Sequence, residues 1–269
     1  MRNSSKQNFT QQVERLLRHR WLVWGVLASS FAIVFFHRVS LAVVSDQLMA
    51  EFNLGAAALG NLGAMYFYVY TVMQIPSGIL ADTTGPRLTV SVGMLLAAAG
   101  AALFALASGL SMAFAGRFLT GLGVSVVFVA VQKAQTAWFR MSEFATITGL
   151  TSTIGNIGAA LAATPLAFLV AAIGWRHSFL VIAALGVVGA VACWLLVRDR
   201  PQDLGLPSMA ELEAYESGTE LPDTQQQSAI PFRQALHYVL HNRHTIPLFI
   251  TALGFNGALQ SLTAMWGIP

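Results

Sequence analysis

The chain has 269 residues, of which 55% are hydrophobic and only 10% are charged, and its net charge is +3 at pH 7. Soluble domains usually carry about 25% charged residues, so this composition excludes a chain whose surface mostly faces water. The single cysteine, Cys193, excludes a disulfide framework and a cysteine metal site.

Seven apolar runs follow one another along the chain. A helix needs about 20 apolar residues to cross the hydrocarbon core of a bilayer. The runs that meet this length are residues 21–44, 59–81, 88–108, 112–137, 146–172, 178–197 and 245–269. The first run is too long for the core of a cleaved signal peptide, and six more follow it, so we expect no cleavage. The sequence therefore predicts an all-α polytopic membrane protein.

The runs divide the chain into four segments. We predict a cytoplasmic N-terminal tail at 1–20, a six-helix transmembrane bundle at 21–198, a linker at 199–243 and a seventh transmembrane helix at 244–269. The linker is rich in proline, glutamine and acidic residues, which is typical of a solvated segment. Its end, residues 232–240, carries apolar residues at helical spacing and predicts a short amphipathic helix on the membrane surface.

Basic residues gather on one side of the predicted spans. Eleven lie in the tail, in the linker or in loops on the same side, and Arg176 alone lies opposite. The eleven are Arg2, Lys6, Arg15, Arg18, Arg20, Arg87, Arg140, Arg198, Arg200, Arg233 and Arg243. The positive-inside rule then places the N-terminus and the linker in the cytoplasm of a bacterial-type inner membrane. The same placement explains the positive charge without a nucleic-acid partner.

Three further basic residues, Arg38, Arg117 and Lys133, fall inside predicted spans, whereas all twelve acids lie in the tail, the loops or the linker. A charge inside the bilayer costs about 2.5–3.5 kcal/mol and is usually kept for function. Because the spans offer no carboxylate, the natural partner of these cations is a small-molecule anion from outside the protein. Beyond that anion and the lipid bilayer, we expect no metal and no cofactor.

Arg38 and one face of the second span are the first binding candidates. The planar fork of Arg38 suits two-point contact with a carboxylate or phosphate, and the alternative is that it reaches the outer headgroups. Tyr66, Tyr70 and Gln74 recur every four residues and share one helix face. Such a stripe favours a water-filled cavity, while helix–helix hydrogen bonding is the competing interpretation.

Other polar residues could complete the lining of such a cavity. Gln132 lies in the fourth span, and Ser152 and Asn156 lie in the fifth. Asn156 belongs to the segment TSTIGNIG, where small residues let helices pack closely, so a structural role is equally open for it. Near the ends of the fourth span, Lys133 is expected to reach toward the headgroups, and Arg117 is expected to serve packing or gating.

His37 precedes Arg38 and is a candidate for proton coupling, because histidine can titrate near neutral pH. Only a pH-dependent transport rate would assign it this role.

A sequence pattern between the second and third spans points to a family. The segment QIPSGILADTTGPR at 74–87 contains G-x-x-x-D-x-x-G-x-R, with Gly78, Asp82, Gly85 and Arg87 in place. It resembles the loop between the second and third helices of the major facilitator superfamily, and RFLTGLG at 117–123 resembles the fourth-helix signature. FHRVSLAVV at 36–44 and KAQTAWF at 133–139 resemble the anion:cation symporters of sugar acids, and GNIG at 155–158 resembles the organophosphate antiporters. The resemblance covers the whole chain.

The resemblance implies a fold and a function. The fold would be the N-terminal six-helix bundle of a major facilitator protein plus a seventh helix. The function would be secondary active transport, or symport, of a small organic anion such as a carboxylate or sugar acid by alternating access. Arg38 occupies the position of the first-helix arginine that holds the substrate in both groups. Gly78, Asp82, Gly85 and Arg87 would form a conformational latch, in which Gly78 permits close helix approach and Asp82 holds a neighbouring helix N-terminus.

In the superfamily this latch looks across to the eleventh helix of a second bundle. That helix lies outside this chain, so Asp82 and Arg87 are expected to pair locally or stay solvated. Because residues 266–269 fall inside the seventh run, we expect a truncated form that lacks a C-terminal bundle; the alternative is association of two copies. A membrane-embedded solute sensor and a non-transporting fragment are the other interpretations. An enzyme is not expected, since the chain has no His-Glu-x-x-His, no paired membrane aspartates and no nucleophile elbow.

Overall fold

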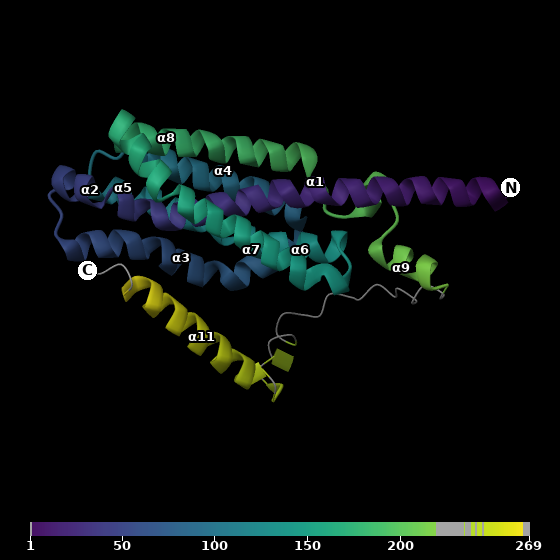
Figure 1. Cartoon of the computed structure of the whole chain (residues 1–269). Coiled ribbons are helices and arrows are strands. Elements are labelled where there is room, and N and C mark those ends of the chain that lie inside the picture. The colour runs from purple at the N-terminus through teal and green to yellow at the C-terminus, as the bar shows by residue number, and fades with distance from the viewer. Residues whose placement is uncertain (1, 219–233, 235–237, 240, 244, 266–269) are drawn as a thin grey trace. The chain divides into compact units, whose positions relative to one another are not determined.

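The computed structural model describes residues 2–218, 234, 238–239, 241–243 and 245–265, and every regular element in them is helical (Figure 1). The chain forms two compact units, residues 1–219 and 220–269, which are described separately. The α-helices of the first unit are α1 (Arg2–Val43), α2 (Ser45–Phe52), α3 (Ala56–Thr83), α4 (Gly85–Ala105), α5 (Leu110–Ser125), α6 (Val127–Trp138), α7 (Phe144–Leu161), α8 (Thr164–Leu196) and α9 (Met209–Ser217). Short 3-10 helices occupy Met141–Glu143 and Pro201–Leu204, and the second unit contains α11 (Thr245–Met265).

Four stretches of the described chain are long and apolar enough to cross a membrane: Phe9–Val43, Gly85–Ala105, Leu110–Trp138 and Met141–Leu196. The last stretch contains the fifth and sixth predicted spans. It breaks inside α8 at Gly174, whose φ of 78° and ψ of 159° are not helical. α3, with 28 residues, contains the second predicted span but is not among these four stretches. In α11 the described apolar part, Thr245–Phe255, is shorter.

Helix α1 begins well before the first predicted span. Its 42 residues correspond to about 63 Å at 1.5 Å per residue, roughly twice the thickness of the hydrocarbon core. The predicted tail is therefore helical, and its N-terminal part projects beyond the other helices of the first unit (Figure 1).

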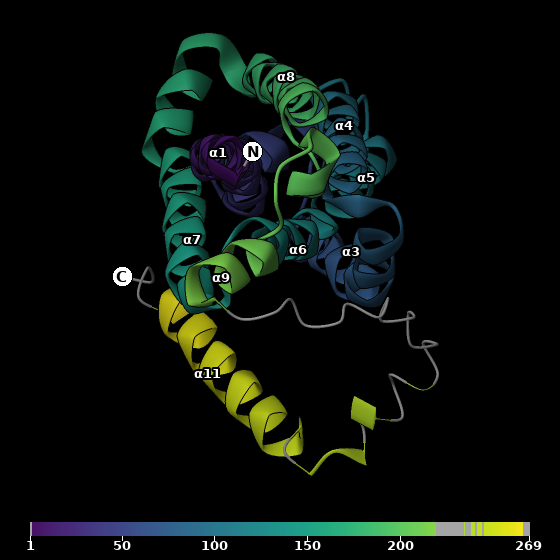
Figure 2. The ribbon, with the colours of Figure 1, turned by 90° about the vertical axis from the view of Figure 1, so that its right-hand side faces the viewer.

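The core of the first unit forms around α1. Figure 2 looks along this helix and shows α7, α8, α4 and α6 around it. Small residues let these helices approach closely, as is usual between membrane helices. A Cβ on Gly158 of α7 would fall on the backbone of Ala32 in α1, and a Cβ on Gly93 of α4 would lie 2.6 Å from the carbonyl oxygen of Gly123 in α5.

Helix α9 lies within the predicted linker. Ser208 and Glu211 form its capping box, with Glu211 N donating to Ser208 Oγ at 3.1 Å and Ser208 N donating to Glu211 Oε2 at 2.6 Å. Leu212 is buried, and the ring of Tyr215 lies 4.4 Å from that of Phe9 in α1. This part of the linker is therefore folded onto the bundle. The predicted amphipathic helix at 232–240 lies mostly outside the described residues.

Candidate functional site

Arg38 lies on α1 between two aromatic rings. Its guanidinium carbon is 5.7 Å from the ring centre of Phe35 and 5.4 Å from that of Phe67. The side chain is half-buried, and no described residue forms a hydrogen bond or an ion pair with it. The rings provide weak cation–π attraction, but they carry no negative charge. The N–H donors of Arg38 therefore remain available to an anion.

The polar stripe of α3 lies close to Arg38 and is partly used within the protein. Tyr66 is buried, and its hydroxyl donates to the carbonyl oxygen of Val34 in α1 at 3.2 Å. This is the helix–helix hydrogen bond of the competing interpretation. Tyr70 stacks on Tyr66 with ring centres 6.2 Å apart, is half-buried and interacts electrostatically with Arg38. Gln74 donates from Nε2 to the Tyr70 carbonyl oxygen at 3.2 Å.

A second polar cluster joins α1, α6 and α7. The hydroxyl of Thr151 accepts hydrogen bonds from Gln135 Nε2 at 2.7 Å and from Trp24 Nε1 at 2.9 Å. Thr148 donates to Gln135 Oε1 at 3.1 Å, while its contact with Gln132 Oε1 is longer, at 3.5 Å. Gln132 was predicted from the sequence, and the other four residues were not. The signal that could have indicated them is the spacing of three residues within each polar pair on α6 and α7, which places both members on one helix face.

Ser152 and Asn156 lie beside the packed face of α7. Ser152 is half-buried and donates to the carbonyl oxygen of Thr148 in its own helix at 3.0 Å. Asn156 is exposed. No described hydrogen bond connects either side chain to Arg38. A role for them in binding stays a prediction.

His37 and Arg117 are enclosed in the bundle. Arg117 is 2% exposed, donates from Nη1 to the His37 carbonyl oxygen at 3.2 Å and lies 5.1 Å above the ring centre of Tyr66. Neither Arg117 Nε nor His37 Nε2 has a hydrogen-bond partner among the described residues. Tyr66 thus lies beside Arg117, and the described structure shows no acidic partner for Arg117.

The charged residues of the predicted latch pair within the first unit. Asp82 forms an ion pair with Lys133 Nζ at 2.7 Å, in place of the contact with headgroups that we expected for Lys133. Arg87 donates from Nε to the Trp194 carbonyl oxygen at 2.8 Å, and its guanidinium carbon lies 4.3 Å above that ring. In the described structure Asp82 and Arg87 thus both have partners within the first unit.

The two glycines of the latch differ in their surroundings. Gly85 has a φ of +79°, and a Cβ there would meet the carboxylate of Asp199, which accepts a hydrogen bond from the Arg87 backbone N–H at 2.7 Å. A side chain at this position would therefore be strained and would clash. A Cβ on Gly78 would have no neighbour within 4 Å in the described structure. No described helix therefore packs against Gly78, and the close helix approach expected at this position stays a prediction.

Comparison with known proteins shows the family of this chain. The sequence profile of the Major Facilitator Superfamily matches residues 16–268. The chain belongs to this superfamily. It is 26% identical over 224 residues to a probable sulfoacetate transporter, SauU, of Cupriavidus necator, covering 82% of this chain and 52% of that protein. It is 29% identical over 219 residues to the membrane sensor protein UhpC of Escherichia coli K12, covering 79% of this chain and 48% of that protein.

The fold is similar to that of solved transporters. A bacterial homologue of the human lysosomal transporter Spinster, in an inward-facing and unoccupied conformation, superposes with a TM-score of 0.61 at 21% identity, over 68% of this chain and 44% of that chain. The family, the all-α polytopic fold and the membrane location predicted from the sequence are therefore confirmed. Membership of this superfamily also supports a role other than catalysis. The chain spans about half the length of the curated relatives that it matches.

Proposed function

We propose that this chain forms the substrate-binding N-terminal half of a secondary transporter for a small organic anion, and that Arg38 holds the anionic group of the substrate. The observation that carries the proposal is the half-buried Arg38 guanidinium, which lies within a membrane helix and has no acidic partner in the described structure. A cation in this position is costly, so it is usually kept for function.

The surroundings of Arg38 suit a carboxylate, sulfonate or phosphate. The rings of Phe35 and Phe67 lie near the guanidinium and displace water beside it, and a lower local dielectric strengthens its attraction to an anion. A planar anionic group can accept two parallel N–H bonds from arginine, and such charge-assisted bonds are about twice as strong as neutral ones. Arg117 lies behind Tyr66 and adds positive potential without being exposed itself.

The relatives support this substrate class and also raise a second candidate function. SauU is a probable sulfoacetate transporter, and sulfoacetate is a small organic anion. UhpC is a membrane sensor, and a sensor would bind an anion without carrying it across the membrane. Both functions need the anion site at Arg38. Alternating access requires two bundles, so we propose transport for the whole protein and anion binding for the half described by this chain.

Several residues retain proposed roles around this site. Tyr70, Gln74, Gln132, Ser152 and Asn156 are proposed to line the path of the substrate. The ion pair of Asp82 with Lys133 is proposed to belong to the conformational latch, and His37 remains the candidate for coupling.

The test is a binding titration of the purified chain in lipid nanodiscs, with calorimetry as the readout. Sulfoacetate and D-gluconate serve as anionic probes, and D-glucose is the uncharged control. Losing hydrogen bonds to a charged group costs about 1.5–3 kcal/mol, so Arg38→Gln is expected to weaken binding of the anions by about 10- to 150-fold. Arg38→Lys keeps the charge but loses the planar fork. Its affinity for the anions is expected to be intermediate between those of the wild type and Arg38→Gln.

Arg200→Gln is the matched control, because it removes an exposed arginine at a distant position. It is expected to bind the anions as the wild type does. Unchanged affinity in Arg38→Gln would refute the proposal. Flux of the anion in proteoliposomes that contain the whole protein, with both bundles, distinguishes the two candidate functions, since a transporter moves the anion and a sensor only binds it.

A further inference from the structure

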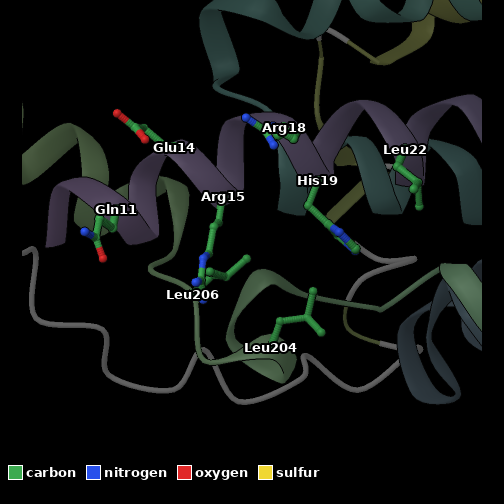
Figure 3. A pocket seen from close by; sticks show the side chains of 8 residues that line it. All are labelled: Gln11, Glu14, Arg15, Arg18, His19, Leu22, Leu204 and Leu206. Atoms are coloured by element: carbon green, nitrogen blue, oxygen red, sulfur yellow. The ribbon is translucent and has the colours of Figure 1, made fainter. Parts of the chain in front are cut away.

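A cavity lies beside the N-terminal part of α1, on the side that the basic residues predict to be cytoplasmic. Its volume is about 720 Å³. The helix contributes one wall, and the end of the 3-10 helix Pro201–Leu204 with the segment that follows it contributes the facing wall (Figure 3). The main lining side chains are Arg15, Arg18, His19, Leu22, Leu204 and Leu206.

The charges of this cavity are left without internal partners. Arg15 and Arg18 are exposed, and neither forms an ion pair or a hydrogen bond with a described residue. Figure 3 shows Arg15 reaching from α1 toward Leu206, whereas Arg18 and the acid of the described lining, Glu14, lie along the opposite edge of the helix in this view. The buried Nε2 of His19 also lacks a hydrogen-bond partner in the described structure. The cavity therefore presents donors and positive charge to a ligand.

The position of the cavity along α1 matches the surface of a bilayer. Trp21 is 45% exposed and Leu22 is 43% exposed, and exposed tryptophans gather at membrane interfaces. At 1.5 Å per residue, Arg18 and Arg15 lie about 4.5 and 9 Å beyond Trp21 along the helix axis. The headgroup layer on each side of a bilayer is about 5–8 Å thick. Arg18 thus lies at the depth of the lipid headgroups and Arg15 at their outer edge, with Leu22 at the edge of the acyl chains.

We propose that this cavity binds the phosphate headgroup of an anionic phospholipid. Arg15 and Arg18 contact the phosphate, and Leu22 and Leu204 contact the beginning of an acyl chain. Free inorganic phosphate shares the headgroup chemistry and would use the same two arginines. It would gain nothing from the leucines, which is why the apolar wall favours the lipid. This site is separate from Arg38 and does not depend on the proposed transport function.

The experiment measures phospholipid retained by the purified chain in native mass spectrometry, after mixing with equal amounts of phosphatidylglycerol and phosphatidylcholine. The wild type is expected to retain phosphatidylglycerol preferentially. Each arginine near an anionic surface contributes about 1 kcal/mol, or roughly 5-fold, to the preference for an anionic lipid. The double variant R15Q/R18Q is therefore expected to lower the preference for phosphatidylglycerol by about 30-fold. The matched control, R2Q/K6Q, removes two charges of the same N-terminal segment and is expected to keep the wild-type ratio.

Two further arms keep the result decisive. Glu14→Gln removes the one negative charge of the lining, so it is expected to increase the retention of phosphatidylglycerol, which a misfolded protein would not do. Millimolar inorganic phosphate is expected to leave the lipid in place. The proposal is overturned if R15Q/R18Q retains the wild-type preference, if Glu14→Gln lowers it, or if inorganic phosphate displaces the lipid.

Discussion

The hydroxyl of Thr151 is the point at which three helices share hydrogen bonds. It accepts from Trp24 Nε1 at 2.9 Å and from Gln135 Nε2 at 2.7 Å, and it donates to the Ile147 carbonyl oxygen at 2.8 Å. Thr151 is 1% exposed and Gln135 is 2% exposed, so water cannot replace the lost partner. Thr151→Val keeps the volume of the side chain but leaves the buried donor of Gln135 and the partly buried donor of Trp24 without an acceptor.

The size of the effect follows from the number of donors that lose their partner. Hydrogen bonds between membrane helices average about 0.6 kcal/mol and reach about 1.7 kcal/mol. Two such bonds give about 1–3 kcal/mol, which agrees with the lower range for leaving a buried donor unsatisfied. We expect Thr151→Val to lower the free energy of unfolding by this amount. The assay is equilibrium unfolding of the purified chain in mixed detergent micelles with increasing SDS, followed by circular dichroism.

Thr153→Val provides the matched control on the same helix. Thr153 is exposed, and its hydroxyl donates to Gly149 O of its own helix at 3.0 Å. This variant is expected to unfold within about 0.5 kcal/mol of the wild type. In a double-mutant cycle, Trp24→Phe and Thr151→Val should be non-additive, because they remove the same hydrogen bond. If Thr151→Val unfolds like Thr153→Val, the shared hydrogen bonds do not hold α1, α6 and α7 together.

Two more predictions concern contacts elsewhere in the bundle. Burial raises the pKa of Glu51, but hydrogen bonds from Arg176 and Trp175 and the charge of Arg176 together lower it below its usual 4.5. The contact between Glu51 and Arg176 therefore stabilises the folded protein fully above about pH 4.5, and this stabilisation is lost as the pH falls through the lowered pKa of Glu51. It contributes at most about 1 kcal/mol to the free energy of unfolding, because both side chains are partly exposed. Thermal unfolding between pH 6 and 3 should show a smaller acid loss in Glu51→Gln, and an identical loss would contradict the assignment. Gly158→Val should lower the free energy of unfolding by about 1–3 kcal/mol, because its side chain would clash with α1. Gly149→Ala, with open space around its Cβ, should leave the free energy of unfolding nearly unchanged. Equal SDS midpoints for these two variants would argue against the close approach of α1 and α7.

Local patterns in the sequence account for the spans and some of their breaks. Apolar runs of about 20 residues predict the helices, and the prediction of a break between 172 and 178 corresponds to the non-helical Gly174. Helix α9 was missed, although Ser208 and Glu211 have the spacing of a capping box. The acidic composition of the linker hid this signal.

The contacts of the candidate site were harder to predict, because they join residues far apart in the chain. Arg38 could be identified as an unpaired cation, since a charge within an apolar run is conspicuous in the sequence. Asp82 and Lys133 are 51 positions apart and meet only because α3 packs beside α6. Similarly, the sequence left open whether Tyr66 faces water or another helix. Only the placement of Val34 in α1 gives its hydroxyl a partner.

Chemical footprinting of Arg38 tests the central claim most directly. Phenylglyoxal modifies accessible arginines, and peptide mass spectrometry reports the modification at each position of the wild-type chain. Sulfoacetate is expected to protect Arg38 while leaving Arg140, which pairs with Glu216, modified to the same extent as without the anion. If sulfoacetate binds and Arg38 is modified at an unchanged rate, the anion lies elsewhere and Arg38 does not hold it.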